Sequence, residues 1–101
     1  MVRHVVFFKF KLEVSPEERK EFVRSLKELP ARVPGIIANG PGAPEVGEDF
    51  TGTPRSYHVA LILGFADCQA LDHYASHPNH VPVVELARQL CESIVAVDFE
   101  I

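Results

Sequence analysis

Two segments of this 101-residue chain are apolar on both of the faces that a β-strand presents. Strand alternation in residues 4–11 puts Val6 and Phe8 on one face and Val5 and Phe7 on the other. Residues 56–65 repeat the pattern, with Val59 and the odd-numbered positions on one face and His58 and the even-numbered positions on the other. One layer of helices can cover only one face of a sheet, so the second apolar face requires a partner.

The order of elements predicts the rest of the fold. Residues 15–18 read Ser-Pro-Glu-Glu, a helix start with a capping box, and the apolar stripe runs to about Leu29, where Pro30 and Pro34 end the helix. A short strand is expected at residues 36–40 and a long loop at 40–54. A helix capped by Asp67, a third helix and a last strand at 94–101 follow. This predicts one α+β domain over residues 1–101, a ferredoxin-like sandwich with a four-stranded antiparallel sheet. The uncovered sheet face predicts a homodimer, a dimeric α+β barrel.

Composition limits the class of protein and of partner. The net charge is −4 and no run of Lys and Arg lies on one element, so we expect no nucleic-acid partner. The apolar runs are too short to cross a bilayer, so we expect no membrane contact. The first residues read as a strand rather than an export signal, which predicts a cytoplasmic protein. Cys68 and Cys91 are then expected to be reduced, packed thiols.

The junction between the second and third predicted helices concentrates the polar chemistry. Tyr74, His77 and His80 surround Pro78 there. An imidazole near its ordinary pKa can accept a proton at cellular pH, so His80 is a candidate general base that Tyr74 could assist. The alternative is that both side chains only shape the helix junction. His4 lies on the strand face that meets the helices. It is either a ligand contact or a core histidine whose ring nitrogens are hydrogen-bonded within the protein. His77 and His80 have a spacing that suits metals, but no third ligand lies in register, so we expect no metal and no cofactor.

The chain resembles the stress-responsive A/B barrel (Dabb) family of small dimeric α+β proteins. The similarity rests on residues 4–11, on Pro34-Gly35-Ile36, on residues 57–65 and 71–80, and on the acidic ending at 97–100. It implies a homodimer with a pocket between sheet and helices in each subunit. A plant member of that family is a polyketide cyclase, whose general base corresponds to His80, its assisting tyrosine to Tyr74 and a pocket histidine to His4. A second pocket histidine of the cyclase falls at Val59, and a pocket tyrosine falls at Leu26.

We therefore predict a small apolar or aromatic ligand between sheet and helices, with His80 and Tyr74 as candidate catalytic residues for lyase or cyclase chemistry. The predicted ligand-binding residues are His4, Val6, Phe8, Leu26, Val59 and His77. Two alternatives stay open: a non-catalytic, stress-associated homodimer, and a cofactorless monooxygenase, which rests on analogy of fold alone.

Overall fold

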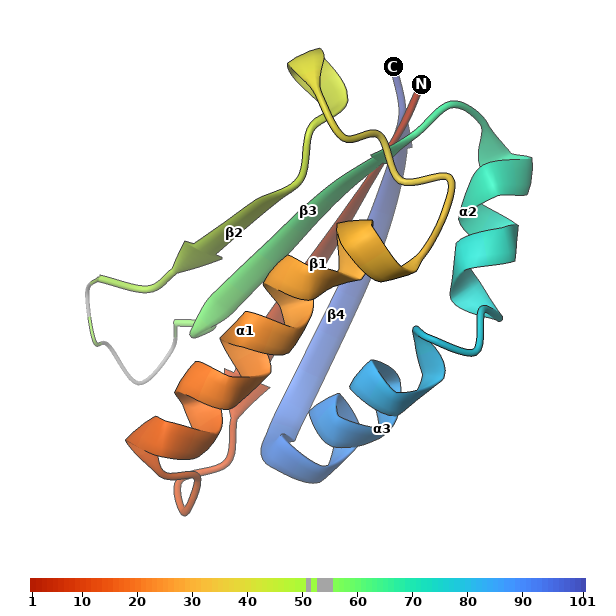
Figure 1. Cartoon of the computed structure of the whole chain (residues 1–101). Helices are drawn as coiled ribbons and strands as arrows, with labels where there is room; N and C mark the ends of the chain where they lie inside the picture. The colour runs from red at the N-terminus through yellow and green to blue at the C-terminus, as the bar shows by residue number, and fades with distance from the viewer. Residues whose placement is uncertain (51, 53–55) are drawn as a thin grey trace.

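The protein alternates strands and helices along the chain, and its computed structural model describes residues 1–50, 52 and 56–101. The elements are β1 (Val2–Phe10), α1 (Pro16–Arg32), a short 3-10 helix η1 (Gly40–Gly42), β2 (Glu45–Glu48), β3 (Val59–Phe65), α2 (Cys68–Ala75), α3 (Val81–Leu90) and β4 (Cys91–Glu100). The strands form one sheet in the order β2–β3–β1–β4, and every pair is antiparallel. All the helices lie on one side of this sheet (Figure 1). This is the predicted ferredoxin-like α+β fold.

The first helix begins where the sequence indicates and ends later. The Ser15 hydroxyl accepts a hydrogen bond from the backbone N–H of Glu18, and the Glu18 carboxylate accepts one from the Ser15 N–H, so the capping box is confirmed. The helix continues through Pro30 to Arg32. A proline in the last turn removes only one intrahelical hydrogen bond. Burial of Leu29 and Val33 on either side of it holds that turn against the sheet.

The predicted strand at residues 36–40 is wrong. Ile36 makes a single bridge to Phe65, and the fourth strand is β2, which lies inside the segment predicted to be a loop. Residues 51, 53 and 54 of that predicted loop lie outside the described part of the chain. β2 escapes detection because it is an edge strand with exposed acidic ends and a glycine, so it lacks the apolar alternation of a buried strand.

The sheet face turned away from the helices is apolar and exposed. The strand register sets Phe7 opposite Val95 and Val5 opposite Val97, with Phe99 farther along β4. Phe7 is 36% exposed, Val95 40%, Val97 37% and Phe99 55%. The two apolar faces expected from the strand sequences are therefore present in the fold: helices cover one face and leave the other open.

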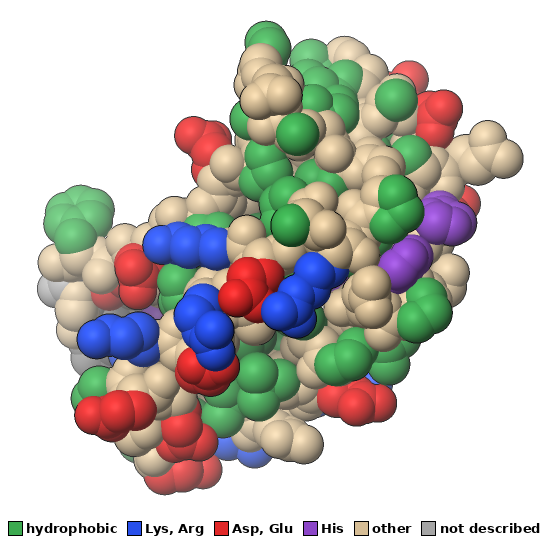
Figure 2. All heavy atoms as spheres, viewed as in Figure 1, with side chains coloured by type: hydrophobic (Ala, Val, Ile, Leu, Met, Phe, Trp, Pro, Cys, Tyr) green, Lys and Arg blue, Asp and Glu red, His purple; other side chains and the backbone are tan. Residues whose placement is uncertain are grey.

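The helix side carries charges of both signs. Figure 2 shows blue and red side chains interspersed across α1, with apolar groups between them. Arg24 pairs with Glu21 and Glu28, and Arg32 pairs with Glu28 at 2.8 Å. These ion pairs neutralise part of the charge on this surface of α1.

Candidate functional site

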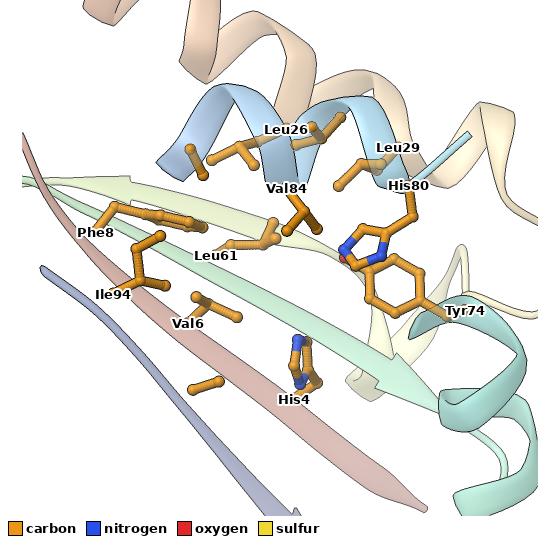
Figure 3. Close-up of a pocket in the computed structure, with 13 residues that line it drawn as sticks. His4, Val6, Phe8, Leu26, Leu29, Leu61, Tyr74, His80, Val84 and Ile94 are labelled. Carbon is orange, nitrogen blue, oxygen red and sulfur yellow. The ribbon is translucent and has the colours of Figure 1, made fainter. Parts of the chain in front are cut away.

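A cavity of about 190 Å³ lies between the sheet and helices α1 and α3. Its walls come from both layers, and one end is polar while the other is apolar (Figure 3). The lining residues are His4, Val6, Phe8, Leu26, Leu29, Leu61, Tyr74, His80, Val83, Val84, Ala87, Ile94 and Ala96. Most of the wall belongs to β1, α3 and β4, and β3 contributes Leu61. The cavity therefore lies toward the β4 edge of the sheet.

The helix junction places two aromatic side chains at the polar end. Tyr74 is in the last turn of α2, and His80 directly precedes α3. Their ring centroids are 4.1 Å apart with the planes tilted by 35°. Tyr74 is buried, whereas His80 is half-buried and faces the cavity (Figure 3). The turn after Tyr74 is closed by backbone hydrogen bonds from His77 N–H to the Tyr74 carbonyl and from His80 N–H to the His77 carbonyl.

The backbone selects the tautomer of His80. Its Nδ1 lies 3.2 Å from the carbonyl oxygen of Ala75. Because a carbonyl can only accept, Nδ1 carries the proton and Nε2 of the neutral ring keeps its lone pair. Nε2 is the ring atom that points into the cavity (Figure 3). The geometry therefore presents a basic nitrogen to whatever occupies the cavity.

Burial sets the protonation states at this end. It lowers the pKa of His80, and the positive charges that His4 and His77 can carry lower it further, against the opposing effect of the Ala75 carbonyl. Burial alone raises the pKa of Tyr74 far above its ordinary value. At neutral pH the site therefore holds an uncharged imidazole beside a protonated phenol, an acceptor beside a donor.

A carboxylate orients His4 on the floor of the cavity. His4 Nδ1 is 2.5 Å from the Oδ1 of Asp98, its cross-strand partner on β4. The His4 ring meets the Tyr74 ring edge-on at 5.8 Å between centroids. Its other nitrogen points up toward Tyr74 and His80 (Figure 3). Asp98 could not be identified as a site residue from the sequence, because strand alternation gives its face but not which residue of β1 it opposes.

The structure brings most of the predicted site together. His80, Tyr74, His4, Val6, Phe8 and Leu26 all line the cavity, whereas Val59 and His77 do not. Val59 is buried opposite Phe8 at the β3 side of the core, beyond the end of the cavity, and Leu61 supplies the β3 wall instead. His77 accepts a hydrogen bond on Nδ1 from the Asn79 N–H and contacts the His73 ring, so it shapes the turn.

The remaining wall residues were not identified as a site from the sequence. The helical period already turned Val84 and Ala87 inward, and strand alternation groups Ile94 with Ala96. Periodicity reports which face is covered, but it does not distinguish a cavity wall from a close-packed core. The space itself lies between side chains of α1, α3 and the sheet, and its existence is a property of tertiary packing.

His58 occupies a separate environment at the other end of β1. It was expected to face away from the helices, but its ring stacks on the buried Phe10 with centroids 5.6 Å apart. β3 begins only at Val59, so strand alternation does not extend back to His58. The pairing of β1 with β3 ends at Phe8 and Val59, and beyond it the Phe10 N–H donates to His58 Nδ1 at 2.9 Å. The Arg19 guanidinium lies 5.0 Å above the Phe10 ring.

The cysteines differ from expectation in one respect. Cys91 is a buried free thiol at the start of β4, and burial raises its pKa to about 11. Cys68 is also free but is exposed at the start of α2, so the prediction that it is packed is wrong. Among the residues the structure describes, no group of three His, Cys, Asp or Glu side chains is placed to hold a metal ion. Within the same residues, every helix is too short or too polar to cross a bilayer.

The family model described as "Stress responsive A/B Barrel Domain" (Dabb) matches residues 2–101. Among solved structures, a dimeric protein of unknown function and ferredoxin-like fold from Bacteroides fragilis NCTC 9343 is 30% identical, with a TM-score of 0.78 over 99% of this chain and 95% of that one. A dimeric ferredoxin-like protein of unknown function from Thermobifida fusca YX is 22% identical, with a TM-score of 0.84 over 99% and 90%. The hydroxynitrile lyase from Passiflora edulis is 18% identical, with a TM-score of 0.84 over 99% and 92%. These last two similarities show the fold. No curated protein matches the sequence.

Proposed function

Because the chain belongs to the stress-responsive A/B barrel (Dabb) family, we propose that it works as a homodimer whose subunits each bind a small apolar or aromatic ligand in the cavity. His80 then acts as a general base on that ligand, in lyase or cyclase chemistry. The observation that carries this proposal is the hydrogen bond between His80 Nδ1 and the Ala75 carbonyl. It leaves a basic Nε2 facing a mostly apolar cavity.

The chemistry follows from the pair of polar atoms at this end. His80 Nε2 takes a proton from a carbon next to a ligand carbonyl, and the electron pair left on that carbon moves toward the carbonyl oxygen. The Tyr74 hydroxyl donates a hydrogen bond to that oxygen as its negative charge grows. The enolate then attacks a second carbonyl of the same ligand, or expels a leaving group. The imidazolium returns its proton to the oxygen or the group that gains charge.

The dimer part of the proposal rests on the open sheet face. Phe7, Val95, Val97 and Phe99 form a continuous apolar surface of a kind that soluble monomers rarely expose. The similar proteins from B. fragilis and T. fusca are described as dimeric. We expect light scattering at micromolar concentration to give twice the chain mass of 11.2 kDa. A mass of one chain would contradict it.

The ligand part is tested by a thermal-shift panel of aromatic aldehydes and ketones, β-diketones, aromatic acids and fatty acids. A true ligand raises the melting temperature by mass action. We expect His80→Ala to weaken that rise, and His73→Ala, a matched change of an exposed histidine on α2, to leave it intact. An equal rise in wild type and His80→Ala would place the ligand elsewhere. A panel with no binder, in a dimer that melts high, would favour the non-catalytic homodimer instead.

A further inference from the structure

The cavity has no permanently charged cation that could pair with a negatively charged ligand. Its lining in the described chain includes neither lysine nor arginine, and its polar members are His4, Tyr74 and His80. Burial lowers the pKa of His80, so this imidazole is uncharged at neutral pH. The Tyr74 phenol is likewise neutral there, because burial raises its pKa. An anion entering the cavity would meet hydrogen-bonding groups but no fixed positive charge.

The ionised side chain beside the cavity is that of Asp98, which carries a negative charge. Asp98 lies against His4 at 2.5 Å, so this pair has a net charge of zero when His4 is protonated and −1 when it is not. Strand alternation sets Glu100 on the same face of β4 as Asp98. The floor of the cavity is therefore neutral or negative in every protonation state of His4. A second carboxylate placed beside it would be repelled or left unpaired.

The size of the cavity and the hydrogen-bonding groups at its polar end limit the class of ligand further. A volume of about 190 Å³ compares with the roughly 150 Å³ of an engineered cavity that holds benzene. The polar end offers one hydroxyl donor, from Tyr74, one lone pair, on His80 Nε2, and the second ring nitrogen of His4. A carbonyl oxygen complements the donor, and an adjacent N–H or O–H complements the lone pair.

We propose that the cavity selects uncharged ligands: single-ring aromatic or short aliphatic molecules that carry one carbonyl, with or without a neighbouring N–H or O–H. It rejects carboxylates of the same shape. This inference rests on the proposed function, because it names the ligand class of the same site. A carboxyl group buried in apolar surroundings has its pKa raised by up to roughly 3–5 units, which measures how strongly such a site disfavours the anion. The cavity is open on one side, so we expect a neutral-to-anion preference of about 100-fold.

Benzamide and benzoate form the test pair, because their planar polar groups have the same shape and differ in charge. Each is titrated into the wild-type protein at pH 7.5 while the ring resonances of His4 and His80 are followed by NMR. We expect benzamide to shift these resonances with a dissociation constant about 100-fold below that of benzoate. Benzoate binding at these resonances as tightly as benzamide would overturn the charge rule and leave the proposed pocket standing. Benzamide causing no shift would overturn the ligand class, while the thermal-shift panel decides separately whether the pocket binds anything.

A positive charge added at the opening of the cavity tests whether charge causes the preference for neutral ligands. Ala96 is an exposed wall residue of β4, so a longer side chain there can reach the opening without disturbing the core. We expect the ratio of benzoate affinity to benzamide affinity to be at least tenfold higher in Ala96→Lys than in Ala96→Met, because the two side chains occupy similar space at the opening and differ in charge. Ala96→Met is the control of similar length without charge. Equal ratios in the lysine and methionine variants would show that charge does not set the preference, and would overturn the proposal.

Discussion

His80 and His58 are partly buried histidines whose Nδ1 atoms both face the backbone, but their backbone partners have opposite polarity. His80 Nδ1 lies against the carbonyl of Ala75, so it donates and leaves Nε2 basic. His58 Nδ1 accepts from the Phe10 N–H, so its proton sits on Nε2 and its lone pair is occupied. Burial lowers the pKa of both rings. The comparison shows that the hydrogen-bond partner, rather than burial, decides which histidine can serve as a base and which can only hold the fold.

The largest expected effect separates the two histidines by activity. In whatever reaction the ligand panel leads to, we expect His80→Ala to lower kcat/KM by about 10²–10⁴, the usual contribution of a general base. His58 lines no part of the cavity, so His58→Ala should stay within a few-fold of wild type when assayed well below its melting temperature. Added imidazole should restore part of the activity of His80→Ala. Equal losses in the two variants would break the comparison.

The second expected effect distinguishes His58 from His80 by its contribution to the free energy of unfolding. Phe10 is buried beyond the end of the β1–β3 pairing, and removing the His58 ring leaves its N–H without an acceptor. An unsatisfied buried donor costs about 1–3 kcal/mol, so urea unfolding of His58→Ala should show a loss of that size. His58→Asn keeps an acceptor oxygen in a similar position and should recover part of it. His73→Ala, at an exposed position, should change the free energy of unfolding by less than about 0.5 kcal/mol.

These two histidines also show how much of the structure can be predicted from the sequence. Helix starts, the two apolar strands and the open sheet face follow from local rules, because capping residues and strand alternation act within a few positions. The histidine–proline junction could be singled out for the same reason. The tautomer of His80 could not, because it depends on a turn that brings the Ala75 carbonyl back to the ring.

Long-range geometry accounts for the expectations that failed. The edge strand β2 has no apolar pattern of its own and forms because β3 offers it a free edge. The packing of His58 on Phe10 depends on where β3 begins and on which residue of β1 it faces there. Asp98 meets His4 through the pairing of β1 with β4. Each depends on which residues of distant segments lie opposite one another, and a single sequence does not specify that.

The third prediction tests the donor beside His80. Tyr74→Phe removes the hydroxyl but keeps the ring that packs against His80 at 4.1 Å. We expect the affinity for benzamide to fall by about 1 kcal/mol, roughly fivefold, because one hydrogen bond to its carbonyl is lost. Toluene has no polar atom, so calorimetry should give it the same affinity for both proteins. An unchanged affinity for benzamide would mean that the Tyr74 hydroxyl does not contact the ligand.

The smallest expected effect is the acid sensitivity of the His58 contact. Burial lowers the pKa of His58, with the charges of Arg19 and Lys9 in the same direction, whereas Asp49 and Glu92 raise it. Because the folded-state pKa lies below the ordinary 6.5, the stabilisation is complete above about pH 6.5 and is lost as the pH falls through the folded-state value. The two carboxylates oppose the loss, so it should be smaller than that of His58→Ala.

The measurement of this pH effect is the free energy of unfolding from pH 7.5 to 5 at one fixed protein concentration. His58→Asn cannot titrate there, and its stability should fall less steeply than that of wild type, with His80 accounting for part of the remaining slope. Parallel curves would show that His58 stays neutral across this range or that its proton does not disturb the Phe10 contact.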